Sequence, residues 1–226
     1  MDARVPPACA IRRAAWARGY RDRGKPIRLD VDTFDMSTGT PGGHEQIMSS
    51  PRVQPLRPVI TTEQIQKRVK ELARQISDDY RGETIQMLAV LENAFMFLAD
   101  LVRELEVPVV CQFIKPKYSR PQGAPGTAND VMEIFFSHEP DIKGQHILIV
   151  EGLVHSGVTS EFLMNDLKAR GAASVKLVTL LDRQSARRVP LQPDYFGFLV
   201  DDAFLIGYGL GAVEQTNRNL PYLAAR

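Results

Sequence analysis

The chain has 226 residues, enough for one domain of ordinary size plus additional sequence. A hydrophobic content of 44% supports a sizeable core, and a net charge of +1 gives no general attraction to polyanions. The two cysteines form neither a disulfide framework nor a metal-ligand spacing, and no apolar run approaches the roughly 20 residues of a membrane helix.

Residues 1–55 are predicted to be a disordered basic extension, and residues 56–226 a folded domain. Residues 1–28 contain eight Lys or Arg and two Asp, a net charge of 8 − 2 = +6, so the remainder carries 1 − 6 = −5. The extension contains several Pro, Gly and Ser clusters and has no sustained apolar period. A transit peptide or a nucleic-acid arm is an alternative for the Arg-rich start, but a disordered tail is the simpler interpretation.

From residue 58 onward the pattern alternates between helices and strands. The sequence Thr61-Thr62-Glu63-Gln64 is typical of a capping box with Thr61 or Thr62 as the N-cap, and apolar residues then recur at helical spacing. The elements expected after this helix are a strand at 87–91, a helix at 94–105, strands at 109–114 and 131–136 around a mobile loop at 115–130, a strand at 147–150, a helix near 159–170, and strands at 175–181, 195–198 and 204–206.

Strands that alternate with helices indicate an α/β fold with a mainly parallel sheet covered on both faces. In such sheets, ligands bind beyond the carboxyl ends of the strands. We therefore expect Glu92, residues 151–159 and Asp182-Arg183 to lie along one rim.

The segment from His146 to Ser160 is the most informative part of the chain. It begins as a buried apolar strand and continues into a turn that contains Ser156, Gly157 and Thr159, just before a helical pattern. Such a turn directs backbone N–H groups at one point and adds hydroxyl groups, which suits a phosphate. An ordinary strand–helix turn is the alternative.

Glu151-Gly152-Leu153-Val154-His155-Ser156-Gly157-Val158-Thr159 resembles the phosphoribosyl-diphosphate (PRPP) signature of type I phosphoribosyltransferases. Taken with further matches, the chain is similar to bacterial hypoxanthine/guanine phosphoribosyltransferases from about residue 59 to 222. The resemblance implies the type I phosphoribosyltransferase fold with a small hood, and transfer of phosphoribosyl from PRPP to a purine base in nucleotide salvage. The further matches are Val90–Leu101, Thr179–Arg183, Asp194–Phe198, Phe204–Leu210 and Arg218–Tyr222.

The resemblance also implies roles for individual residues. Glu151 faces the ribose hydroxyls, and His155 stands where the family has the Asp that handles the proton at purine N7. An imidazole can accept that proton near neutral pH. A solvated strand end for Glu151, a surface loop residue for His155 and a core position for Phe204 are the alternatives. The remaining implied positions are Ser156, Gly157, Val158 and Thr159 for the 5′-phosphate, Arg183, Phe204 and Leu205 for the purine, and Glu92, Asn93 and Arg218 for the pyrophosphate.

Several positions depart from the family pattern. Gly152 and Gly211 replace acids, so the Mg²⁺ that the resemblance implies is expected to bind less well, and we assign no metal ligand. Glu92 and Asn93 replace the Lys and Gly of the pyrophosphate loop. Glu92 places a negative charge beside a diphosphate, and two like charges about 4 Å apart repel by about 4 kcal/mol at an effective dielectric near 20.

Two hypotheses follow. The first is a weak or altered purine phosphoribosyltransferase. The second is a catalytically inactive, regulatory homologue that binds PRPP or a nucleotide, which Glu92, Gly152 and Gly211 favour. The expected partners are PRPP or a purine nucleoside monophosphate and further copies of the chain. We expect a cytoplasmic protein with no membrane association and no nucleic-acid partner.

Overall fold

The computed structural model describes residues 56–119, 131–136, 141–201, 204–211 and 216–225. The expected extension at 1–55 lies outside the described residues, so the boundary at residue 56 stays a prediction. Within the described part of the chain, no helix is long and apolar enough to cross a bilayer. The elements are β1 Pro58–Ile60, α2 Thr62–Asp79, β2 Ile85–Val90, α3 Phe95–Glu104, β3 Val109–Ser119, β4 Val131–Phe136, β5 His146–Val154, α4 Val158–Ala169, β6 Ser174–Asp182, the 3₁₀ helix η1 Gln184–Ala186, β7 Tyr195–Leu199, β8 Leu205–Ile206 and β9 Leu223–Ala225.

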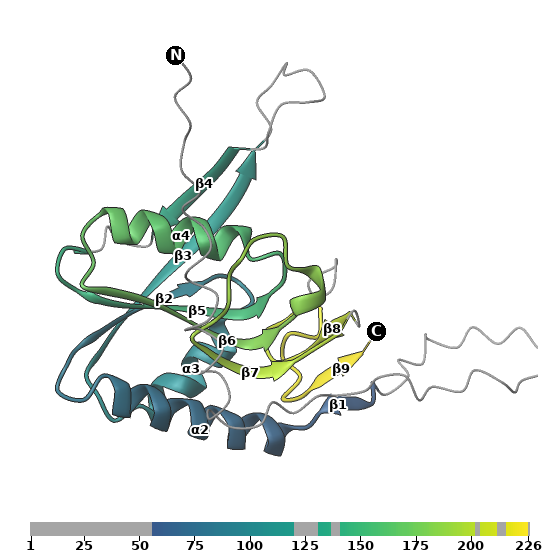
Figure 1. Cartoon of the computed structure of the whole chain (residues 1–226). Helices are drawn as coiled ribbons and strands as arrows, with labels where there is room; N and C mark the ends of the chain where they lie inside the picture. The colour runs from purple at the N-terminus through teal and green to yellow at the C-terminus, as the bar shows by residue number, and fades with distance from the viewer. Residues whose placement is uncertain (1–55, 120–130, 137–140, 202–203, 212–215, 226) are drawn as a thin grey trace, which may run out of the picture.

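A six-stranded sheet in the order β4-β3-β2-β5-β6-β7 forms the centre of the molecule (Figure 1). Five of its strands are parallel, and only β4 runs antiparallel, on β3. Helices α2 and α3 cover one face and α4 covers the other (Figure 1). The prediction of a mainly parallel sheet flanked by helices is therefore confirmed.

Strand β5 is buried on both faces. Ile147 and Ile149 pack in the cluster that includes Leu163 of α4. Leu148 and Val150 pack in the larger cluster with α2 and α3. Because successive side chains of a strand point to opposite faces, this burial accounts for the uninterrupted apolar run.

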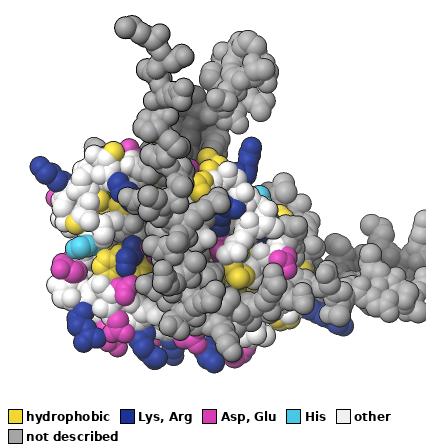
Figure 2. All heavy atoms as spheres, in the orientation of Figure 1, with side chains coloured by type: hydrophobic (Ala, Val, Ile, Leu, Met, Phe, Trp, Pro, Cys, Tyr) yellow, Lys and Arg dark blue, Asp and Glu magenta, His cyan; other side chains and the backbone are white. Residues whose placement is uncertain are grey.

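Helix α2 begins as its sequence predicts. Thr61 is the N-cap, its hydroxyl accepts from the Gln64 N–H, and the Gln64 side chain accepts from the Thr61 N–H, which completes a capping box. The apolar side chains, including Ile65 and Ile76, are fully buried. The opposite face carries mixed charges, visible along the lower edge in Figure 2.

A three-stranded sheet of β1, β9 and β8 forms the hood that the resemblance implies. It joins the two ends of the domain, because β1 pairs with β9 and the Thr62 hydroxyl donates to the Pro221 carbonyl over 3.0 Å. The Tyr208 hydroxyl donates to Asp100, which connects the hood to α3. The hood is thus fastened to the same helices that cover the main sheet.

Several expected boundaries differ from the structure by one or two residues, such as the start of β2 at Ile85, and three further differences concern β3, β5 and β8. Strand β3 continues to Ser119, so the loop expected at 115–130 is wrong for residues 115–119, while 120–130 lie outside the described residues. The sequence around Pro116 is polar and lacks the apolar pattern of a strand. The strand forms there because these residues pair with antiparallel β4. Strand β5 also continues to Val154, which remains paired with Asp182 of β6. Phe204 precedes β8 and lies outside it.

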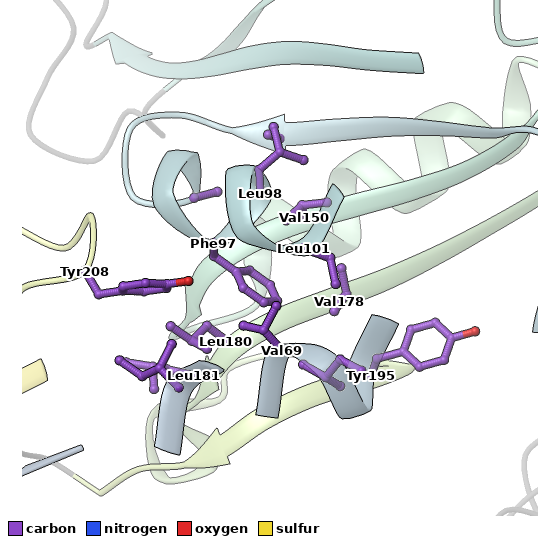
Figure 3. Close-up of a cluster of buried hydrophobic side chains, with 14 of the residues drawn as sticks. Val69, Phe97, Leu98, Leu101, Val150, Val178, Leu180, Leu181, Tyr195 and Tyr208 are labelled. Carbon is purple, nitrogen blue, oxygen red and sulfur yellow. The ribbon is translucent and has the colours of Figure 1, made fainter. Parts of the chain in front are cut away.

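Phe97 is among the largest fully buried side chains. It packs in the cluster between the helices and the sheet, pointing from α3 toward Val69 and Leu180 (Figure 3). We expect Phe97→Ala to lower the free energy of unfolding by about 3–5 kcal/mol, because it removes apolar contacts and leaves a cavity. Phe95→Ala is the control in the same helix, since Phe95 is 39% exposed. Urea unfolding of the two variants checks this expectation, and equal losses would contradict it.

Candidate phosphate and nucleotide site

Glu92, residues 151–159 and Asp182-Arg183 lie at the carboxyl ends of the parallel strands, as expected. Strand β2 ends at Val90, just before Glu92, while β5 ends at Val154 and β6 at Asp182. The registers of β2 with β5 and of β5 with β6 bring these ends to one edge. This is the edge at which parallel sheets bind ligands.

The turn between β5 and α4 has the geometry of a phosphate loop. Gly157 is the N-cap of α4 with a φ of 79°, a left-handed conformation that glycine adopts without strain. The Ser156 hydroxyl accepts from the Val158 N–H over 3.4 Å. The first N–H groups of a helix have no intrahelical acceptor, so the start of α4, with Thr159 in its first turn, can receive an anion.

Arg187, which the sequence analysis did not select, secures this loop. Its guanidinium pairs with Asp182 and donates to the His155 carbonyl over 3.2 Å. A Cβ atom on Gly157 would lie 2.9 Å from the Arg187 Cδ, so the side chain also packs against the turn. Burial raises the pKa of the Asp182 carboxyl, and the charge of Arg187 opposes that shift. The ion pair therefore ties the end of β6 to the phosphate loop.

Glu151 lies beneath the loop in a buried position. The Ser160 hydroxyl donates to its carboxylate over 2.5 Å, and both side chains are almost inaccessible to solvent. Burial raises the pKa of Glu151 to about 7, against the opposing effects of Ser160 and Arg187. In this conformation the carboxylate faces α4, so the ribose role implied by the resemblance stays a prediction.

Glu92 lies between two cations. The Lys115 ammonium is 2.8 Å from one of its carboxylate oxygens, and an Arg218 guanidinium nitrogen is 3.7 Å from the other. The hydrogen bond and charge of Lys115 lower the pKa of Glu92, and Arg218 adds to the effect. Arg218 also donates to the Asn93 side-chain oxygen over 3.0 Å, so the expected pyrophosphate residues do come together.

Gly152 faces the backbone of the neighbouring loop with no space between them. A Cβ atom at position 152 would lie 2.3 Å from the Asn93 carbonyl oxygen. The same oxygen would be 3.1 Å from a Cβ atom on Gly209. The missing acid at 152 is therefore accompanied by a loop that occupies the space its side chain would need.

The backbone N–H of Arg183, an expected purine contact, donates to the Val154 carbonyl over 3.0 Å, which places Arg183 beside the end of β5 where the phosphate loop begins. Phe204 is 48% exposed, which agrees with a stacking surface and not with a core position. Leu205 is buried in β8.

The described residues do not fit a protein-held metal ion. No group of three or more His, Cys, Asp or Glu side chains gathers anywhere in the described part of the chain. At Gly211, a Cβ atom would lie 2.7 Å from the Arg218 Nε, so a cation borders the position where the resemblance implies an acid.

The Glu151 pKa predicts a pH-dependent stability. The folded state favours the protonated acid, so this contribution is complete below 4.5 and disappears as the pH rises to about 7. At 1.36 kcal/mol per pKa unit, the change is roughly 3 kcal/mol. We expect Glu151→Gln to match the wild type near pH 5 and to exceed its stability at pH 8, with Glu161→Gln as the control. Chemical unfolding at both pH values checks this, and a difference independent of pH would contradict it.

The contact at Gly152 predicts a steric cost. We expect Gly152→Ala to lower the free energy of unfolding by about 1–3 kcal/mol, because the new methyl group must displace the Asn93 carbonyl. Gly211→Ala should cost less, because its methyl group meets a side chain that can move. Adding Asn93→Gly should recover part of the loss at 152 by freeing the loop backbone. Urea unfolding of the four variants, including Asn93→Gly alone, measures this coupling, and strict additivity would contradict it.

Comparison with known proteins identifies relatives of this chain. The family described as "Phosphoribosyl transferase domain" matches residues 60–213, which is more than half of the chain. The chain is 34% identical over 166 residues to the hypoxanthine-guanine phosphoribosyltransferase of Bacillus subtilis, across 73% of this chain and 89% of that protein. It is 36% identical over 168 residues to the hypoxanthine phosphoribosyltransferase of Haemophilus influenzae, across 73% and 92% respectively.

Solved structures of relatives share the fold. A hypoxanthine-guanine phosphoribosyltransferase from Bacillus anthracis, with HEPES in its active site, superposes with a TM-score of 0.65 at 35% identity, across 75% of this chain and 95% of that one. A hypoxanthine phosphoribosyl transferase from Trypanosoma cruzi gives 0.66 at 35% identity, across 77% and 94%. The expected type I phosphoribosyltransferase fold is confirmed. The chain therefore belongs to the phosphoribosyltransferase family, and these relatives are hypoxanthine or hypoxanthine-guanine phosphoribosyltransferases.

Proposed function

We propose that this protein binds purine nucleoside 5′-monophosphates and transfers the phosphoribosyl group between PRPP and a purine base in nucleotide salvage, at a reduced rate. The observation that carries the proposal is the phosphate loop, in which left-handed Gly157 opens α4 and Arg187 secures the turn. The names of the relatives support a purine as the base. Exposed Phe204 and the position of Arg183 suit that base beside the loop.

The proposed reaction is a displacement at ribose C1′. Purine N9 forms a bond to C1′ while the bond from C1′ to the diphosphate oxygen breaks, and the diphosphate leaves with the bonding electrons. The proton at purine N7 passes to His155, which is exposed at the start of the loop. The phosphate loop holds the 5′-phosphate in place, so the reacting atoms stay aligned.

We expect the reduced rate from the negative charge of Glu92 and from the lack of space for a side chain at Gly152. Glu92 brings an acid to the diphosphate side, and Gly152 offers no carboxylate and no space for one. These features weaken interactions with PRPP while leaving the 5′-phosphate loop unaffected. Binding of the nucleotide is therefore expected to be stronger than binding of PRPP with Mg²⁺.

The closed space at Gly152 also favours a second candidate, a regulatory homologue that binds nucleotide without turnover. The two candidates share the nucleotide site and differ in the chemical step. Release of IMP or GMP from PRPP with hypoxanthine or guanine supports the enzyme. Tight nucleotide binding with no product supports the regulatory protein. We further propose that the chain assembles with copies of itself and works in the cytoplasm.

A pair of glycine variants tests the site by calorimetry with IMP and GMP. Gly157→Ala should weaken nucleotide binding at least about tenfold, or ~1.4 kcal/mol, because it distorts the loop and collides with Arg187. Gly82→Ala is the matched control, since Gly82 also has a positive φ of 86° but lies in the turn before β2, at the opposite edge. Tight, Mg²⁺-dependent binding of PRPP with no binding of IMP or GMP would contradict the proposed preference.

A further inference from the structure

The ion pair between Glu92 and Lys115 lies where the resemblance implies a lysine at position 92. Strands β2 and β3 are parallel, with Val90 opposite Ile114, and the Leu91 N–H donates to the Ile114 carbonyl over 2.8 Å. This register places residue 115 beside residue 92 at the edge of the sheet. We propose that Lys115 is the cation that contacts the diphosphate group, and that its ammonium exchanges Glu92 for the diphosphate on binding. This inference rests on the proposed function.

The exposure of the pair argues against a role in stability. The Lys115 side chain is 61% exposed and that of Glu92 is 41% exposed, and the Nζ–Oε1 distance is 2.8 Å. Exposed pairs of this kind contribute little to the free energy of unfolding, because both groups are well solvated when apart. The pair does, however, fix an ammonium group at the end of β2, within the nucleotide site.

The charges of Glu92 and its two cationic partners sum to a net positive charge, which favours binding of an anion. Glu92 faces both Lys115 and the Arg218 guanidinium, so two positive charges surround one negative charge. Arg218 is oriented by the Asn93 side chain and by the Gly209 carbonyl. A lysine ammonium on its flexible stem can exchange Glu92 for an incoming phosphate oxygen. A diphosphate would therefore meet two cations, one of them supplied by β3.

The positive charge lies on a different segment here than in the family pattern. In the family pattern the lysine belongs to the loop after β2, whereas here that position is acidic and the lysine lies on β3. Glu92 puts a negative charge at position 92, and the Lys115 ammonium, 2.8 Å away, supplies a positive charge beside it. Glu92 and the diphosphate compete for the Lys115 ammonium, so the ion pair with Glu92 must break before the diphosphate can bind there.

Inorganic pyrophosphate, titrated by calorimetry into the full chain, tests the inference. Lys115→Met should weaken pyrophosphate binding at least about tenfold, and the loss for pyrophosphate should exceed the loss for IMP at least about fivefold. Lys143→Met removes an exposed lysine at the other end of β5 and should bind both ligands like the wild type. Glu92→Gln should tighten pyrophosphate binding severalfold, because it removes the competing charge.

An exchange of charges gives the sharpest comparison. Lys115→Glu alone should abolish measurable pyrophosphate binding, and adding Glu92→Lys should restore it to within a few-fold of the wild type. Unchanged binding by Lys115→Met would overturn the inference, as would a wild type that binds IMP but not pyrophosphate. A wild type that binds neither ligand would overturn the proposed function as well, so the two failures are distinguishable.

Discussion

The parallel pairing of β5 with β2 and β6 is the constraint on which the rest of the structure depends. Alternate side chains of β5 pack in two different apolar clusters, so a one-residue shift of register would exchange the residues of the two clusters and disrupt the packing of both. That fixed register determines which residues emerge at the carboxyl edge. The phosphate loop, the pair of Asp182 with Arg187 and the loop at Glu92 all take their positions from it.

Much of the fold could be predicted because its signals are local. The capping box of α2 depends on two side chains three residues apart, and β5 contains the uninterrupted apolar run 147–150. Strand β3 beyond Ile114 could not be predicted in the same way, because its polar sequence is held by pairing with β4. Strands β1 and β9 are only three residues long, too short for any periodicity to show.

The residues of the candidate site likewise divide into those with a local sequence signal and those that only the folded structure brings together. The phosphate loop was predictable because glycine and hydroxyl residues follow a strand directly. Arg187 was not, since its role depends on a carboxylate and a carbonyl that only folding brings beside it. The sequence predicts a loop at Lys115, and only the pairing of β2 with β3 shows that this residue lies beside Glu92. Burial of Glu151 against Ser160 likewise depends on how α4 packs on the sheet.

The Asn93 carbonyl, held between Gly152 and Gly209, has an evolutionary consequence. A single substitution that places an acid at position 152 meets a backbone atom, so it lowers stability before it can bring any gain in ligand binding. The accessible route passes first through a change that relaxes the loop at 93, and only then through 152. The fold therefore constrains the order in which substitutions at 93 and 152 can be made without loss of stability.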